Sequence, residues 1–66
     1  MIGSACWVDV AGERVRGVIV REEYIVLVDA PFVTGWLVKL DTPIFLPGVG
    51  QFGHVLECKD TIVLEI

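Results

Sequence analysis

The side chains of this 66-residue chain best suited to hold a soft metal ion are Cys6, His54 and Cys58. His54 and Cys58 lie four positions apart, so on a β-strand both side chains would project from the same face. A closed zinc site needs four ligands, commonly in close Cys-x-x-Cys pairs, and the chain has no such pair. We therefore expect no metal site and no cofactor.

The two cysteines leave two alternatives open. Cys6 and Cys58 could form a disulfide, because the first and last strands of a small barrel are often neighbours. Alternatively, both remain free thiols that pack as small hydrophobic groups. The sequence shows no secretion signal, and this favours the thiols.

The stretch Gly48–Gly53 matches the dinucleotide-binding pattern G-x-G-x-x-G letter for letter. That pattern works only when a helix follows the loop, because the pyrophosphate binds at the helix N-terminus. The residues after Gly53 have the pattern of β-strands instead. We interpret the stretch as a glycine loop that binds no nucleotide.

Residues suited to catalysis are few. Ser4 is the only serine and His54 is the only histidine, and nothing in the sequence marks a group that would orient His54 as a general base. A hydrolase also needs a preorganised, dehydrated cleft, which a chain of this size has little room to build. We expect no catalytic residue, no small-molecule substrate and no enzyme activity.

The element that organises the chain is residues 24–40, where Tyr24–Val28 and Trp36–Leu40 are rich in β-branched and aromatic residues. Both runs are expected to be strands, and Arg21-Glu22-Glu23 is expected to be the exposed turn before them. Gly17 is expected to permit a bend or bulge. No stable helix is expected, because apolar residues do not recur at helical spacing. The other expected elements are strands over Cys6–Val10 and Arg14–Val20, an edge segment over Ile44–Leu46, and a closing hairpin of His54–Cys58 and Thr61–Ile66.

One pattern occurs twice. Val28-Asp29-Ala30-Pro31 is echoed by Leu40-Asp41-Thr42-Pro43, a strand followed by Asp, a small residue and Pro. Aspartate caps a turn, and proline stops a ladder because it lacks an N–H. We interpret both as strand ends. The alternative is that the two corners form one binding rim.

Composition points to a partner. The chain is 55% hydrophobic and 21% charged, while a domain this small buries only about 60% of the surface that its unfolded chain exposes. The excess apolar surface is therefore expected to face another chain, either a copy of the protein or a larger protein partner. Small domains commonly need such support.

Charge argues against polyanionic partners. Nine carboxylates outnumber five scattered cations, giving a net charge of −4. Nucleic-acid-binding domains normally carry a basic stripe, and anionic membrane surfaces attract the same kind of cluster. We expect no nucleic-acid and no membrane partner. The N-terminus has no basic region and meets Asp9 too early for a secretory signal, so a soluble cytoplasmic protein is expected, or a virion protein if a phage encodes it.

The order of elements resembles a known architecture. A strand, then GERVRGVIV, YIVLV, GWLVKLD and a closing hairpin resemble the small SH3-like barrels encoded by bacteria and their phages. The segment around Gly17–Val20 is loosely similar to a KOW element. The resemblance implies a five- to six-stranded antiparallel barrel formed by residues 1–66 as one domain, with residues 1–5 as a loose lead-in. KOW modules of transcription and ribosomal proteins are normally basic, whereas this chain is acidic.

We therefore expect a non-enzymatic protein–protein interaction or structural module, for example a minor component of a phage particle or another multi-protein assembly. The first alternative is a small acidic inhibitor, such as a phage antagonist of a host enzyme or defence system, which would bind a basic site. The second is a nucleic-acid-associated KOW or SH3-like module. The expected interface comprises Val18, Val20, Ile25, Leu27, Phe32, Trp36, Leu37 and Phe45.

Overall fold

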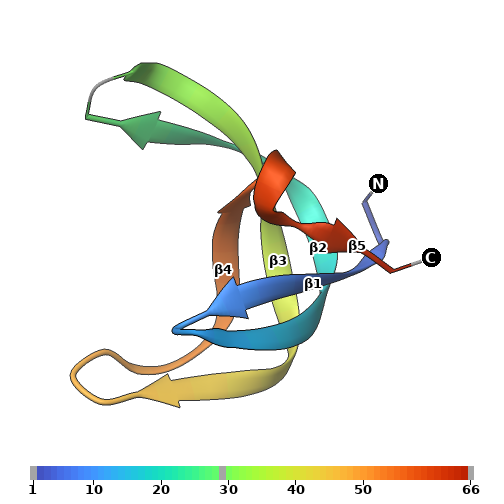
Figure 1. The fold of residues 1–66 in the computed structure, drawn as a ribbon, viewed down its shortest axis with the longest axis vertical. Helices are drawn as coiled ribbons and strands as arrows, with labels where there is room; N and C mark the ends of the chain where they lie inside the picture. The colour runs from blue at the N-terminus through green and yellow to red at the C-terminus, as the bar shows by residue number, and fades with distance from the viewer. Residues whose placement is uncertain (1, 29, 66) are drawn as a thin grey trace.

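The computed structural model describes residues 2–28 and 30–65, apart from the side chains of residues 25, 27 and 30–33. The described chain is all-β, as expected: its antiparallel strands form one unclosed sheet in the order β4-β3-β2-β1-β5 (Figure 1). The only helix in this part of the chain is one 3-10 turn. The elements are β1 (Ala5–Val10), β2 (Glu13–Leu27), β3 (Ala30–Leu46), β4 (Gly50–Cys58), η1 (Lys59–Thr61) and β5 (Val63–Leu64).

β2 and β3 are much longer than the sequence pattern predicted. The expected turn at Arg21-Glu22-Glu23 is wrong, because these three residues continue β2 and pair with Leu37, Trp36 and Gly35 of β3. Their charges are accommodated in the strand by ion pairs of Arg21 with Glu23 and of Glu22 with Lys59. Likewise, Ile44–Leu46 is not a separate edge segment, since β3 runs unbroken to Leu46.

A β-bulge at Val20 changes which residues share a face. Ile19 pairs with Val38, but Arg21 pairs with Leu37, so Val20 is an extra residue in β2. Side chains alternate along a strand, and an extra residue therefore reverses the alternation beyond it. The predicted irregularity in β2 thus exists, but three residues after Gly17.

Gly17 itself permits close contact between strands. It pairs with Leu40, and a Cβ atom at this position would lie 2.6 Å from the Lys39 carbonyl oxygen and 2.6 Å from Val38 Cγ1. Both distances are shorter than van der Waals contact. The close approach of β2 and β3 at this point therefore requires a residue without a side chain, and it does not depend on unusual backbone angles.

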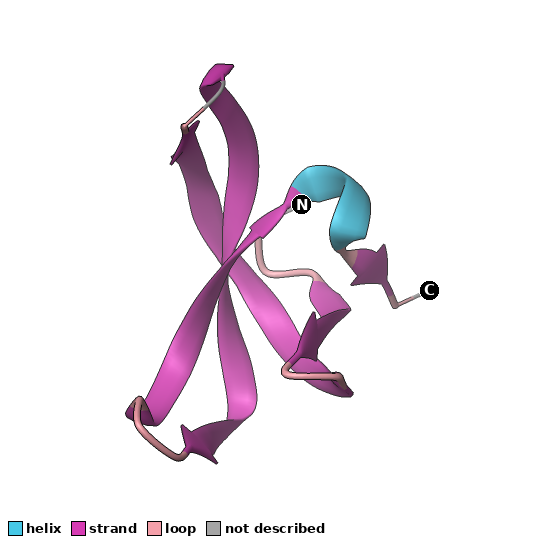
Figure 2. Ribbon diagram, turned by 60° about the vertical axis from the view of Figure 1, so that its left-hand side comes forward, coloured by secondary structure: helices cyan, strands magenta, loops and turns pink. Residues whose placement is uncertain are grey.

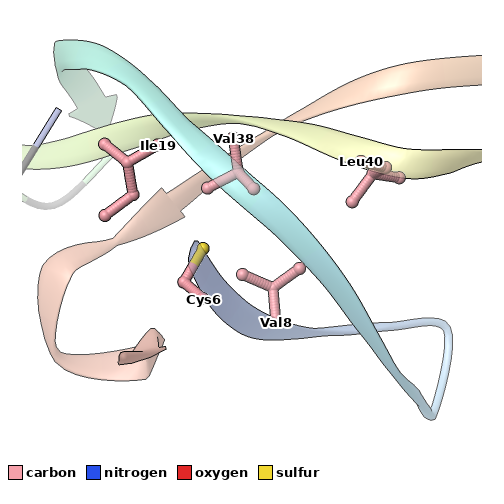
Figure 3. Packing of buried hydrophobic residues seen from close by; sticks show 5 residues of the cluster. All are labelled: Cys6, Val8, Ile19, Val38 and Leu40. Atoms are coloured by element: carbon pink, nitrogen blue, oxygen red, sulfur yellow. The ribbon is translucent and has the colours of Figure 1, made fainter. Parts of the chain in front are cut away.

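The core is small. Cys6 and Val8 from β1, Ile19 from β2, and Val38 and Leu40 from β3 are the buried hydrophobic residues, and their side chains gather between these three strands (Figure 3). Half-buried residues that surround them are Val10, Val15, Trp36, Ile44, Phe52, Val55 and Ile62. Large hydrophobic side chains that remain exposed are Ile2, Val20, Tyr24, Val26, Val28, Phe45, Val49, Leu56, Val63 and Leu64.

Segments near both ends of the chain are hydrogen-bonded to the sheet, in ways that the sequence pattern did not predict. Within the expected lead-in, Gly3 and Ser4 are bonded to β2: the Gly3 N–H donates to the Ile19 carbonyl (2.7 Å) and the Ile19 N–H donates to the Ser4 carbonyl (3.0 Å). The expected C-terminal hairpin is wrong. η1 carries the chain away from β4, and β5 pairs with β1 through Cys6–Leu64 and Trp7–Val63.

The β2–β3 pair extends beyond the rest of the sheet. β1 pairs with β2 only as far as Val18, and β4 pairs with β3 only as far as Gly35. We call residues 21–28 and 30–34 the arm. Residues 21–23 pair with residues 35–37, which β4 also borders, and beyond them residues 24–27 and 30–34 form a two-stranded ribbon. Figures 1 and 2 show it projecting as the hairpin at the top, whereas the β1–β2 and β3–β4 hairpins diverge at the opposite end.

Candidate functional site

The arm presents apolar side chains to solvent. Tyr24, Val26 and Val28 are 67%, 79% and 102% exposed. An isolated two-stranded ribbon is marginally stable in water, and contiguous exposed apolar surface commonly marks an interaction site. The arm is therefore a candidate interaction surface of the described chain.

The predicted interface residues are distributed over the molecule rather than gathered. Val20 is exposed at the bulge, Trp36 is half-buried and packs against the core, and Phe45 is exposed in the β3–β4 hairpin, at the end of β3 remote from the arm. Val18 and Leu37 are half-buried. The side chains of Ile25, Leu27 and Phe32 lie outside the described residues.

Sequence reasoning missed Tyr24, Val26 and Val28. The sequence pattern placed a turn before Tyr24 and assigned the interface to the strand face of Ile25 and Leu27, whose side chains lie outside the described residues. Glu22 lies opposite Trp36 and Tyr24 lies opposite Thr34, so Tyr24 is on the face of the sheet that carries Trp36. A strand containing a charged triplet between two apolar runs was the available signal for the bulge at Val20.

The base of the arm is anchored by η1. The ammonium group of Lys59 lies 4.6 Å from the centroid of the Trp36 ring and also forms an ion pair with Glu22. A cation over a tryptophan face is attracted by the electrons of the ring. These contacts hold the base of the arm to the body of the protein, and they involve no residue beyond Trp36 toward the tip.

A second feature is a cluster that we call the C-terminal clamp: Trp7, Arg16, Asp41 and Glu65. Arg16 donates from Nε and Nη2 to the two carboxylate oxygens of Glu65, at 2.8 and 2.9 Å, and from Nη1 to Asp41 at 2.7 Å. The indole Nε1 of Trp7 also donates to Glu65, at 3.2 Å. The clamp thus ties residue 65 to β1, β2 and β3.

Hydrogen bonds from Arg16 lower the pKa of Glu65 below its ordinary value of 4.5, and the same bonds raise the pKa of Arg16. Sequence reasoning read Arg16 only as an outward-facing residue of an alternating strand. Nothing in the sequence pairs it with a carboxylate 49 positions away.

The pH dependence of stability should reveal this clamp. A carboxylate whose pKa is lowered by folding stabilises the native state above pH 4.5, and that contribution is lost as the pH falls through the native-state pKa. Glu65→Gln should therefore lower the melting temperature at neutral pH and low salt, and should flatten its decline below about pH 4.5. Thermal melts followed by circular dichroism across pH measure both effects.

The matched control is Glu13→Gln, which alters an exposed β2 carboxylate outside the clamp. It should retain the acid-induced decline of the parent. If Glu65→Gln declined as steeply as the parent below pH 4.5, the clamp would not be the source of this acid sensitivity.

Between β2 and β3 lies an open groove of about 420 Å³, which we call the β2–β3 groove, and the clamp residues Trp7, Arg16 and Asp41 form part of its lining. It arises because β2–β3 pairing ends at Gly17–Leu40 and β3–β4 pairing resumes only at Ile44. Residues 41–43 consequently have no paired residue on either neighbouring strand in the described sheet. The groove is lined by Trp7, Arg14, Val15, Arg16, Asp41, Thr42, Pro43 and Ile44.

The groove also gives the outcome for the repeated Asp-x-Pro pattern. At Asp41-Thr42-Pro43 strand pairing stops, as predicted, but β3 continues through the pattern and does not end there. This copy lines the groove. Asp29 and the side chains of Ala30 and Pro31 lie outside the described residues, so a rim shared by the two copies remains a hypothesis.

The residues considered for metal binding and catalysis are separate. His54 is exposed on β4, opposite Lys39, while Cys6 is buried and Cys58 is half-buried, and both thiols are free. Burial raises the pKa of Cys6, which keeps this thiol protonated and unreactive. The described residues contain no group of three His, Cys, Asp or Glu side chains that could hold a metal ion.

The G-x-G-x-x-G stretch is a turn followed by a strand. Gly48 and Gly50 have φ angles of +83° and +100°, the Val49 N–H donates to the Leu46 carbonyl, and β4 begins at Gly50. The predicted glycine loop is thus limited to the turn before Gly50. A strand, rather than the helix that nucleotide binding requires, follows it.

Comparisons with protein-family models, with curated proteins and with solved structures found no match. No helix in the described part of the chain has the length and apolar character needed to cross a membrane. The candidate site therefore rests on the geometry of the arm and the groove alone.

Proposed function

We propose that the protein is a non-enzymatic assembly module that joins other protein chains through its arm, as a small structural component of a multi-protein complex such as a phage particle. The sequential strand order, with β5 paired to β1, supports relating the fold to SH3-like barrels. In this proposal the unclosed sheet is completed by a neighbouring chain.

The observation that carries the proposal is the exposure of Tyr24, Val26 and Val28 on a ribbon with no third strand. Burying an apolar side chain of this kind stabilises a complex by about 1.5–3 kcal/mol. A partner that covers the arm would also support a ribbon that is marginal by itself. A protein surface, which supplies both apolar side chains and main-chain groups, fits these needs.

The distribution of charge supports an assembly role over the two alternatives. Arg14, Arg16, Arg21 and Lys59 each form an ion pair within the described chain, so no basic face gathers for nucleic acid. Among the carboxylates, Asp9, Glu22, Glu23, Asp41 and Glu65 are bound by those cations. An acidic inhibitor would instead present its carboxylates as one free cluster.

Val26→Lys tests the proposal, because it places a charge in the middle of the arm. The parent is expected to self-associate, measured by size-exclusion chromatography with light scattering, and Val26→Lys is expected to be a soluble monomer. The matched control is Val49→Lys, which makes the same substitution at a valine that is 72% exposed in the β3–β4 turn. It should associate like the parent.

Two results would contradict this function. A parent protein that remains a soluble monomer at all concentrations has no surface in need of a neighbour. If Val26→Lys associated as strongly as Val49→Lys, association would occur without the arm.

A further inference from the structure

We propose that the β2–β3 groove of one copy receives the arm of a second copy, so that copies of the chain join head to tail. This inference rests on the proposed function, because it names the surface to which the arm binds. It uses three features: unpaired main-chain groups on both walls of the groove, an apolar floor, and an arm that offers a complementary strand.

The walls of the groove are strand edges. Residues 13–16 of β2 pair with β1 on one side only, and residues 41–43 of β3 pair with neither neighbouring strand in the described sheet. Along a strand, main-chain N–H and C=O groups point to both sides, and those that find no partner must be satisfied by water or by another chain. An extended polypeptide satisfies such edges by adding a strand, and here it would displace the Arg16–Asp41 ion pair that joins the two walls at 2.7 Å.

The floor of the groove is apolar. Val15 and Ile44 are half-buried residues that pack against the core and also line the groove, together with Trp7 and Pro43. The four residues Asp41–Ile44 of one wall span about 13 Å at 3.3 Å per residue. The groove therefore suits a short extended segment with apolar side chains, such as the end of a hairpin.

The arm provides such a segment. Neither β1 nor β4 extends beside its two strands, and Tyr24, Val26 and Val28 are exposed on it. The arm lies at one end of the β2–β3 pair, shown at the top of Figure 1, and the residues that line the groove lie beyond the other end, where pairing stops at Gly17–Leu40. A chain therefore cannot fill its own groove with its own arm.

Contact between two arms is the competing arrangement, and the arm sequence opposes it. On the edge formed by β3, Pro31 lacks the N–H that a strand ladder needs. On the edge formed by β2, an antiparallel register centred on Glu22 and Glu23 would oppose these residues to their own copies, and like charges opposed across a ladder are destabilising.

The rim of the groove carries a cation instead. The Arg14 side chain is 57% exposed, and its contact with Asp9, at 3.4 Å, is longer than the contacts that Arg16 makes in the clamp. The groove lining holds Arg14 and Arg16 against one carboxylate, Asp41, whereas the arm holds Glu22 and Glu23 against one cation, Arg21, so the two surfaces have opposite net charge. Arm-to-groove contact is heterologous, so a row of copies keeps one unused arm at one end and one unused groove at the other until a ring closes.

Mixing two variants tests this arrangement. Val26→Lys damages the arm and leaves the groove intact, whereas Thr42→Arg places a long charged side chain in the groove, at an exposed residue, and leaves the arm intact. Each variant alone should be a monomer. Their equimolar mixture should form a 1:1 heterodimer and nothing larger, because only one intact arm and one intact groove meet. Native mass spectrometry distinguishes the two chains by mass.

Gln51→Lys, an exposed β4 residue that does not line the groove, is the charge control and should assemble like the parent. If Thr42→Arg assembled like the parent, or if the mixture stayed as two monomers, the arm would bind elsewhere, and this inference would fall while the assembly function stood. If Val26→Lys assembled like the parent, or the parent were monomeric, both would fall.

Discussion

Replacing Ile19 with alanine is expected to destabilise the protein by about 2–5 kcal/mol, the cost of removing a large buried aliphatic side chain and leaving a cavity. Ile19 is 1% exposed and pairs with Val38 at the centre of the five-residue core. A domain of this size is stable by only about 3–10 kcal/mol in total. Urea unfolding followed by circular dichroism should therefore show a much lower transition midpoint for the variant than for the parent, or no folded baseline at all.

Val20→Ala is the matched control, because it shortens the next residue of the same strand where the side chain is exposed at the bulge. It should change the free energy of unfolding by no more than about 0.5 kcal/mol. Equal losses from the two substitutions would mean that Ile19 does not occupy a tightly packed centre.

Gly17→Ala should also destabilise the protein, by about 1–3 kcal/mol, although alanine is ordinarily better than glycine in a strand. The added Cβ would lie 2.6 Å from the backbone oxygen of Lys39, so β2 and β3 would have to separate. The same urea titration measures the loss. Gly17→Val should cost more, since its two further methyl groups enlarge the clash.

Gly53→Ala is the matched control for Gly17→Ala, because it replaces a strand glycine at a position where an added side chain is not crowded. Gly53 lies in β4, and a Cβ built there meets no atom within 4 Å. This variant should be as stable as the parent or slightly more stable. If neither Gly17→Ala nor Gly53→Ala lowered the free energy of unfolding, β2 and β3 would not approach each other as closely at Gly17 as their register implies.

The sequence predicted the all-β class and most strand positions because alternation and β-branched residues are local signals. It did not predict where β2 and β3 would remain paired. Arg21-Glu22-Glu23 looks like a turn, since three charged residues in a row are usually solvated. Their place in a strand depends on Trp36 and Lys59, which are distant in sequence.

The candidate site was only partly predictable for the same reason. The surplus of apolar residues is a property of composition, and exposed residues such as Val26 and Val28 agree with it. Which apolar residues face solvent depends on the bulge at Val20. A bulge depends on how two strands pair, and the local sequence does not show this. Local sequence patterns could not predict the groove, because it forms where β3 stops pairing with both β2 and β4.

The two tryptophans are both held by the last residues of the chain: Trp36 lies beneath Lys59 of η1, and Trp7 donates to Glu65 just beyond β5. Detachment of the C-terminal segment would remove a polar neighbour from each indole while leaving the β2–β3 pair in place. The intrinsic fluorescence of the unlabelled protein is thus a natural reporter for fraying of this one segment, distinct from melting of the sheet.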